Sequence, residues 1–211
     1  MATLVSVNVG LPREFSYRGG TVRSSIWKEP VSGRIPVRGV NVHGDAQADT
    51  SVHGGYYKAV YSYSIEDYAW WATELDRPFP PGTFGENLTI EGIDMAAVLI
   101  GEVWRVGSTT LQVTEPRFPC FKLGFKMGTQ GFVKRFARAQ RPGTYLAIAD
   151  DGDVAAGDQI EVLSKPQHDV TIGLFAAAYL DRSLAPRLLD AQTLSPDWRE
   201  WAQGHIDSVG S

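Results

Sequence analysis

The single cysteine of the chain, Cys120, lies in a segment whose residue types favour a presented thiol. The segment reads EPRFPCFKLG, and its prolines Pro116 and Pro119 fix backbone dihedrals and remove two amide donors. Arg117 and Lys122 lie close in sequence and favour the thiolate. A thiolate is a nucleophile and also a soft ligand for transition metals, so both chemistries are open here. A buried free cysteine, by contrast, usually behaves as a small apolar residue.

The spacing of histidine and cysteine does not indicate a zinc site. Zinc usually gathers several such ligands at short spacings, and the sequence contains no CxxC and no HxxxH. If Cys120 binds a metal, the other ligands must come largely from elsewhere, as from a cofactor. A hydrolytic metal centre could be drawn from four residues of VHGDAQADTSVHGG: His43, Asp45, Asp49 and His53. We favour a polar loop with turn-forming Asp and Gly for this segment.

The same segment ends in a glycine pair that could bind an anion. Gly54 and Gly55 let backbone amides approach a ligand closely, as phosphate-cradling loops do. Lys58 follows three residues later and supplies positive charge. A glycine pair alone is a weak signal, so the loop is a candidate only.

A further candidate is the segment TFGENLTIEG. Gly85 permits an unusual dihedral just before an expected strand, and Glu86 and Asn87 follow it. A carboxylate accepts hydrogen bonds, and an amide both donates and accepts them. Such groups suit the recognition of a heterocycle with alternating donors and acceptors, and they equally suit a capped turn.

The composition is that of an ordinary globular chain. Of 211 residues, 43% are hydrophobic and 21% are charged, with a formal net charge of -4. This charge argues against a dedicated nucleic-acid binder, so any anion site must be a local patch. No apolar run approaches the roughly 20 residues of a membrane helix, and the start of the chain does not resemble a signal peptide. One cysteine cannot form an internal disulfide, so we expect a cytoplasmic protein.

Short strands dominate the chain up to about residue 165. Leu4–Val9 alternates apolar and polar residues with a period of two, as a half-buried strand does. The segment KEPVSG reads as a turn by composition. Many short strands of this kind predict a barrel or a sandwich. Further strands are expected at residues 21–27, 33–40, 58–64, 87–93, 102–107, 109–115, 144–150 and 158–163.

Helices interrupt the strands and end the chain. A helix is expected to follow Ser64 as its N-cap, and another within residues 129–140. Beyond residue 165 the pattern changes to short helices, so we expect a first domain over 1–165 and a second over 166–211. The second is too small to bury a core alone and should dock on the first. Three short helices are expected there, with N-caps at Thr171, Ser183 and Ser195.

The motifs, taken together and in order, resemble one known family. GDAQAD, VHGGYYKAVYSYSIEDY, GTFGENLTIEG, IGEVWRVGS, LQVTEPRFPC and the C-terminal TIGLFAAAYLDR look like those of bacterial MOSC proteins. The family name denotes the molybdenum cofactor sulfurase C-terminal domain. The match is nearest to short, stand-alone members that reduce N-hydroxylated bases such as N-hydroxylaminopurine, and it covers nearly the whole chain.

The resemblance implies a fold, a cofactor and a set of site residues. The fold is mainly β with α (α+β), a MOSC β-barrel-like core with inserted helices and a small C-terminal three-helix domain. The cofactor is the molybdenum cofactor in a molybdopterin form, with Cys120 as the protein's ligand to molybdenum. The candidates for its phosphate are His53, Gly54, Gly55, Lys58 and Arg117, and those for its pterin ring are Gly85, Glu86 and Asn87.

The implied activity is the reduction of small N-hydroxylated molecules. The sequence shows no iron–sulfur spacing, haem motif or dinucleotide fingerprint, so a separate reductase should supply the electrons. No nucleic-acid or membrane partner is expected, and a homodimer is left open. One alternative is a sulfur carrier with a persulfide on Cys120; another is a module that holds the cofactor without catalysis.

Two residues depart from the family pattern. Many relatives have glutamine where this chain has Glu115, and position 43 is often apolar where it has His43. A carboxylate near an anionic cofactor should be unfavourable unless it points away or pairs with Arg117 or Lys122.

Overall fold

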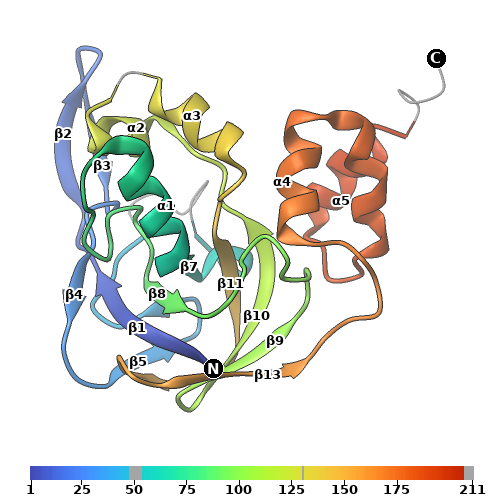
Figure 1. Ribbon diagram of the computed structural model, residues 1–211, viewed down its shortest axis with the longest axis horizontal. Helices are drawn as coiled ribbons and strands as arrows, with labels where there is room; N and C mark the ends of the chain where they lie inside the picture. The colour runs from blue at the N-terminus through green and yellow to red at the C-terminus, as the bar shows by residue number, and fades with distance from the viewer. Residues whose placement is uncertain (48–53, 130, 207–211) are drawn as a thin grey trace.

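A closed β-barrel forms the centre of the computed structural model, which describes residues 1–47, 54–129 and 131–206 (Figure 1). Seven strands follow one another around it in the order β13-β9-β10-β11-β7-β8-β1, and β1 pairs with β13 to close it. All neighbours are antiparallel except β7 and β8. The predicted barrel-like core is therefore confirmed. The strands are β1 (Ala2–Val9), β7 (Val60–Ser64), β8 (Leu88–Glu91), β9 (Val103–Val106), β10 (Thr109–Pro116), β11 (Thr144–Asp150) and β13 (Gln159–Ser164).

Alternation of side chains explains the barrel interior. Leu111 and Val113 of β10 are fully buried, while Gln112 between them is only partly buried. Inward residues of the other strands, such as Leu4 and Leu146, join the same hydrophobic cluster. Closure pairs the edges that an open sheet would leave exposed.

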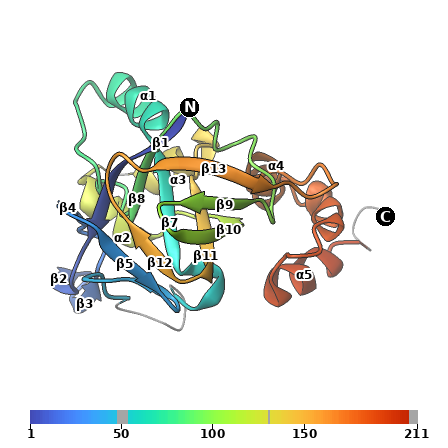
Figure 2. The same cartoon turned by 90° about the horizontal axis from the view of Figure 1, so that it is seen from below.

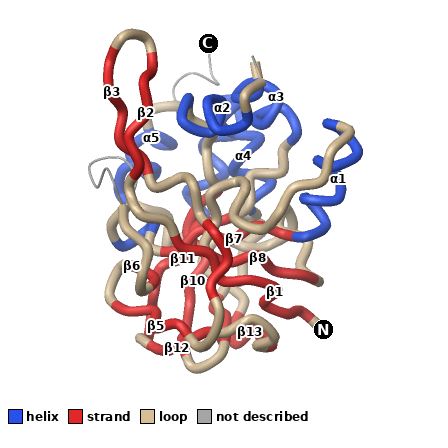
Figure 3. The backbone as a smooth tube through the Cα atoms, turned by 90° about the vertical axis from the view of Figure 1, so that its left-hand side faces the viewer, coloured by secondary structure: helices blue, strands red, loops and turns tan. Residues whose placement is uncertain are grey.

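Smaller strands lie outside the barrel. A hairpin of β2 (Arg13–Tyr17) and β3 (Gly20–Ser24) projects from the body (Figure 3), and β5 (Ile35–Arg38) pairs with β6 (Asn41–Val42) and β12 (Gly152–Val154) (Figure 2). The segment KEPVSG, predicted as a turn, contains β4 (Glu29–Val31), which pairs with β1. That prediction was wrong because proline is tolerated in an edge strand, and β4 ends the sheet order.

Three helices pack above the barrel. Helix α1 (Ile65–Leu75) begins as predicted, because the Ser64 hydroxyl accepts a hydrogen bond from the Asp67 amide at 3.1 Å. Helix α3 (Phe132–Ala139) was also predicted. Helix α2 (Phe121–Met127) was not predicted. It is only seven residues long, follows Pro119 and contains Gly124, and glycine has a poor helix propensity. It begins directly after Cys120.

The C-terminal helices are α4 (Ile172–Leu180), the 3-10 helix η2 (Arg182–Asp190) and α5 (Pro196–Gln203). Thr171 and Ser195 cap α4 and α5 as predicted. Ser183 was predicted wrongly as a cap, because the Asp181 carboxylate fills that role and accepts from the Ser183 amide at 3.1 Å. These helices share one hydrophobic cluster with the barrel, so the boundary at residue 165 stays a prediction. None of the described helices is long and apolar enough to cross a membrane.

An aromatic core between α1 and α3 should contribute much of the stability. Trp71 is fully buried, donates to the Tyr63 hydroxyl at 2.8 Å and stacks on Phe136 at 5.8 Å. Trp71→Ala should lower the free energy of unfolding by about 3–5 kcal/mol. Trp70→Ala, at a partly buried neighbour that contacts Arg141, should cost only about 1 kcal/mol. Urea unfolding of the two variants tests this, and equal losses would contradict it.

Candidate functional site

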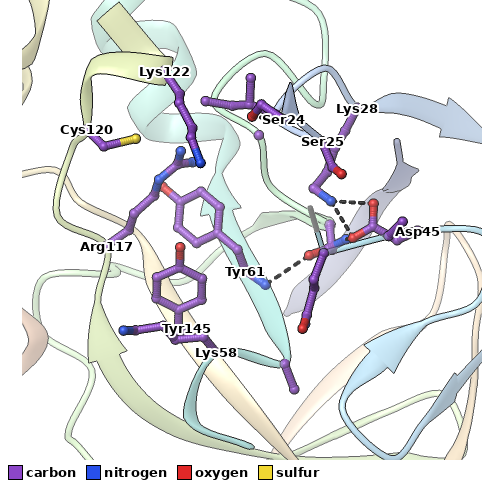
Figure 4. A pocket seen from close by; sticks show the side chains of 16 residues that line it. Ser24, Ser25, Lys28, Asp45, Lys58, Tyr61, Arg117, Cys120, Lys122 and Tyr145 are labelled. Atoms are coloured by element: carbon purple, nitrogen blue, oxygen red, sulfur yellow. Dashed lines mark hydrogen bonds and ion pairs between the residues drawn. The ribbon is translucent and has the colours of Figure 1, made fainter. Parts of the chain in front are cut away.

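A cavity of about 100 Å³ opens beside Cys120 (Figure 4). It brings together five residues that the sequence predicted, from three separate segments of the chain: Lys58, Gly85, Asn87, Arg117 and Cys120. The structure adds residues that sequence reasoning did not place in a cofactor site. These are Ser24, Ser25, Ile26, Lys28, Asp45, Ala46, Gln47, Ala59, Tyr61, Lys122 and Tyr145.

Cys120 stands where β10 has ended and α2 begins. Its backbone is extended and takes the N-cap position of α2, and its side chain is partly buried. Figure 4 shows the sulfur on the same side of the pocket as the Arg117 guanidinium and the Lys122 side chain. The thiol is therefore presented next to cations, as the residue types of the segment predicted.

Arg117 is one of the buried cations of the pocket. Its side chain donates to the Phe84 carbonyl, and its guanidinium carbon lies 4.8 Å from the centre of the Tyr61 ring. Burial opposes its charge, but Tyr145, Tyr61 and Cys120 raise the pKa above its ordinary value. Gly85 makes room for it, because a Cβ at this position of positive φ would lie 3.1 Å from Arg117 Nη1.

Two phenols flank this guanidinium. Burial raises the pKa of both Tyr61 and Tyr145, although Arg117 opposes that shift. Both hydroxyls therefore stay protonated at neutral pH. The Tyr61 hydroxyl donates to the Pro142 carbonyl at 2.7 Å, which fixes its direction.

A buried ion pair forms the opposite wall. The Lys28 ammonium pairs with the Asp45 carboxylate, and both side chains are under a tenth exposed. Asp45 also accepts from the Gly10 amide at 2.8 Å and from Asn87 Nδ2 at 2.9 Å. Burial lowers the pKa of Lys28, and Asp45 opposes that shift. Asn87 Oδ1 in turn accepts from the Tyr61 amide at 3.2 Å, so Asn87 ties this wall to the barrel.

The contacts of Asp45 do not favour the hydrolytic metal centre that the sequence left open. Asp45 is occupied by three donors, and His43 is exposed. Asp49 and His53 lie outside the described residues. Within residues 1–47, 54–129 and 131–206, no group of three acidic, histidine or cysteine side chains could hold a metal ion.

Other candidates lie away from the cavity wall. Glu86 is fully buried, and its Oε1 accepts from Tyr68 Oη, the Gly82 amide and Thr89 Oγ1 at 2.6, 2.6 and 2.7 Å. Its carboxylate thus holds the turn that carries Gly85.

The glycine loop also lies outside the lining set. Gly54 packs against the side chain of Gln47, and the Gly55 amide donates to Gln47 Oε1 at 3.4 Å. Gln47 itself lines the cavity, so the loop supports the wall through this side chain. His53, the remaining candidate of this loop, lies outside the described residues.

Glu115 has a different partner from those expected. Its carboxylate is 4% exposed and lies 3.4 Å from Lys58 Nζ, whereas sequence reasoning offered Arg117 or Lys122. Burial raises the pKa of Glu115, and Lys58 and a hydrogen bond from Trp198 oppose the rise. The pair removes the repulsion that a lone carboxylate would exert on an anionic ligand.

The family model for the MOSC domain matches residues 49–161. YflK of Bacillus subtilis is 33% identical over 93% of this chain and 91% of its own length. YiiM of Escherichia coli is 32% identical over 85% of this chain and 83% of its own length. The chain belongs to the MOSC domain family.

Solved structures agree with this assignment. YiiM from Geobacillus stearothermophilus superposes on this MOSC protein with a TM-score of 0.80 at 26% identity, covering 98% of this chain and all of the other. YiiM from Escherichia coli gives a TM-score of 0.77 at 26% identity, covering 100% and 94%. Both matches span the C-terminal helices, so the resemblance inferred from the motifs is confirmed over the whole chain.

The effects of replacing Lys28 and Asp45 on the free energy of unfolding should be strongly coupled. Asp45→Asn leaves the Lys28 ammonium buried without its counter-ion, so the free energy of unfolding should fall by about 3–5 kcal/mol. Adding Lys28→Met should recover most of that loss. Glu161→Asn, in an exposed pair with Arg105, should cost under about 1 kcal/mol. Wild type, Asp45→Asn, Lys28→Met and the double variant form a double-mutant cycle when their urea unfolding is compared, and additive losses would refute the coupling.

Lys126 should make stability depend on pH. Its ammonium donates to the Ile26 and Gly82 carbonyls at 2.8 and 2.7 Å, and burial lowers its pKa from 10.5 to about 7. Between these values the unfolded chain binds more protons than the folded one, so stability rises with pH. The stability gained at high pH is lost as pH falls from about 10.5 to the folded pKa of about 7.

The comparison of wild type with Lys126→Met isolates this effect. The difference between their free energies of unfolding should change in favour of wild type as pH rises above about 7, and stay constant below it. Lys134→Met, at an exposed position of α3, is the control for removing a lysine. A difference that does not vary with pH for Lys126→Met would show that the pKa of Lys126 is not lowered.

Proposed function

We propose that this MOSC protein is a molybdenum-cofactor-dependent reductase of small N-hydroxylated compounds, with Cys120 as its ligand to molybdenum. The observation that carries the proposal is one soft thiol in a cavity lined by Lys28, Lys58, Arg117 and Lys122. A thiolate suits a soft metal, and clustered cations suit an anionic cofactor. Family membership supports the choice of a molybdopterin.

The described residues fit such a group in two further respects. Ser25 Oγ, on the cavity wall, is buried and has no hydrogen-bond partner among the described residues, so a bound ligand would satisfy it. Gly85 has no side chain and so leaves space beside Arg117, where a Cβ atom would crowd the guanidinium. The phosphate would be held by the cavity's cations, and the ring by hydroxyls and amides near Ser25 and Gln47.

The residues of this chain then have distinct roles. When bound, the cofactor supplies the two electrons that cleave the N–O bond, and two protons are taken up as amine and water form. Cys120 holds the cofactor's metal and tunes it. Arg117 keeps its positive charge at all physiological pH values and favours anions. Lys58 Nζ lies at the cavity wall, 3.4 Å from the Glu115 carboxylate.

Electrons should come from a separate protein. A protein of Gibberella moniliformis named "Reductase" is 34% identical over 70% of this chain, and the match covers only 27% of that protein. This supports reductive chemistry for the family segment within a larger system. The substrate is a small molecule, and neither nucleic acid nor membrane is needed. A cytoplasmic location and a homodimer stay predictions.

Cys120→Ser should abolish the reduction of N-hydroxylaminopurine and lower the molybdenum content of protein made in a cofactor-competent host, because an alcohol is a poor ligand for a soft metal. Elemental analysis and a reduction assay with a chemical electron donor measure both. Tyr56→Phe is the control, because its ring is exposed and does not line the cavity. It should keep both the reductase activity and the molybdenum content of the wild type. An active, fully metallated Cys120→Ser protein would refute the proposal. Cyanide-labile sulfur without molybdenum in the wild type would instead support the sulfur carrier.

A further inference from the structure

The side chain of Phe118 points away from the cavity and into the C-terminal helices. Its neighbours Arg117 and Cys120 line the cavity, while Phe118 itself does not. Its ring centre lies 4.2 Å from that of Tyr179, 5.1 Å from Trp198 and 5.9 Å from Phe175. We call these three residues the Phe118 socket.

The socket is built by two helices. Phe175 and Tyr179 are four residues apart on α4, so they lie on one face of that helix. Trp198 comes from α5 and meets Phe175 edge-on at 5.0 Å. Figure 1 shows α4 beside the barrel, close to where β10 ends. The socket therefore joins both helices to the segment that carries the thiol.

A polar contact joins α5 to the same segment. Trp198 is also the indole that hydrogen-bonds Glu115, and the Glu115 carboxylate lies 3.4 Å from Lys58 Nζ. One tryptophan of the C-terminal helices thus touches Glu115 and Phe118, which lie on either side of Arg117.

The segment between these contacts is stiff. β10 ends at Pro116 and α2 begins at Phe121, with Pro119 between them. Prolines fix φ, so little rotational freedom separates Phe118 from its neighbours. A displacement of the Phe118 ring is therefore passed to Arg117 and Cys120.

We propose that the C-terminal helices are a positioning element of the cavity, and that the Phe118 socket sets the placement of the Cys120 thiol. Tyr179 and Trp198 are positioning residues in this account, since they act through Phe118. The inference rests on the proposed function only for the ligand role of Cys120.

The single cysteine allows a direct test on the protein without cofactor. Iodoacetamide alkylates Cys120 alone, so its rate at one fixed pH reports how that thiol is held. Tyr179→Ala removes the nearest ring of the socket, and the side chain is 45% exposed, so the fold should survive. We expect alkylation to become several-fold faster. Tyr179→Phe should restore the wild-type rate, because it keeps the ring.

The control is Ile206→Ala, just after α5, at a side chain that is 49% exposed. It should leave the alkylation rate unchanged. Unfolding in urea, measured on the same samples, shows whether any change in rate merely follows a loss of stability. Equal rates for wild type, Tyr179→Ala and Ile206→Ala would overturn the proposal. Because the assay needs neither molybdenum nor a substrate, a failure here is distinct from a failure of the proposed reductase activity.

Discussion

The buried charge of Arg117 is the constraint on which the pocket depends. Its side chain is 8% exposed, donates to the Phe84 carbonyl and lies against the Tyr61 ring. Burying a cation is costly unless negative charge compensates for it. An anionic ligand in the adjoining cavity would offset that cost. The same charge lies beside Cys120, so one residue would serve both the proposed metal ligand and the proposed anion site.

Much of the surrounding structure supports this arrangement. The turn held by Glu86 places Gly85 where Arg117 needs space. Asn87 links the Lys28–Asp45 pair to the backbone of Tyr61, beneath the guanidinium. The strands of the barrel contribute Tyr61 and Tyr145 to the cavity wall, and α2 contributes Lys122. The segment that carries Arg117 and Cys120 is thus fixed by contacts from elements far apart in the sequence.

Local patterns predicted the parts of this structure that depend on neighbouring residues. Period-two alternation identified β1, and a hydroxyl before an apolar run identified the cap at Ser64. Cys120, Arg117 and Asn87 were singled out because their types suit a metal, an anion and a heterocycle. The family resemblance then predicted that they share one site, and in the structure they line one cavity.

Features that depend on contacts between distant parts of the chain could not be predicted from local sequence patterns. Lys28 and Asp45 are 17 residues apart, in a segment read as a turn and in a polar loop, and only the fold brings them together. Glu86 looks like a recognition residue from its type, but the direction of its side chain depends on Tyr68 and Thr89. Helix α2 is stabilised by packing on α3 and by Lys126, which outweigh the poor helix propensity around Gly124.

The most direct test of the central claim uses the fact that the chain has one cysteine. Selenium in place of the Cys120 sulfur labels a single position, and X-ray absorption at the molybdenum edge then reports the neighbours of the metal. Protein made in a cofactor-competent host should show selenium bonded to molybdenum. Molybdenum bound without selenium among its ligands would contradict the account.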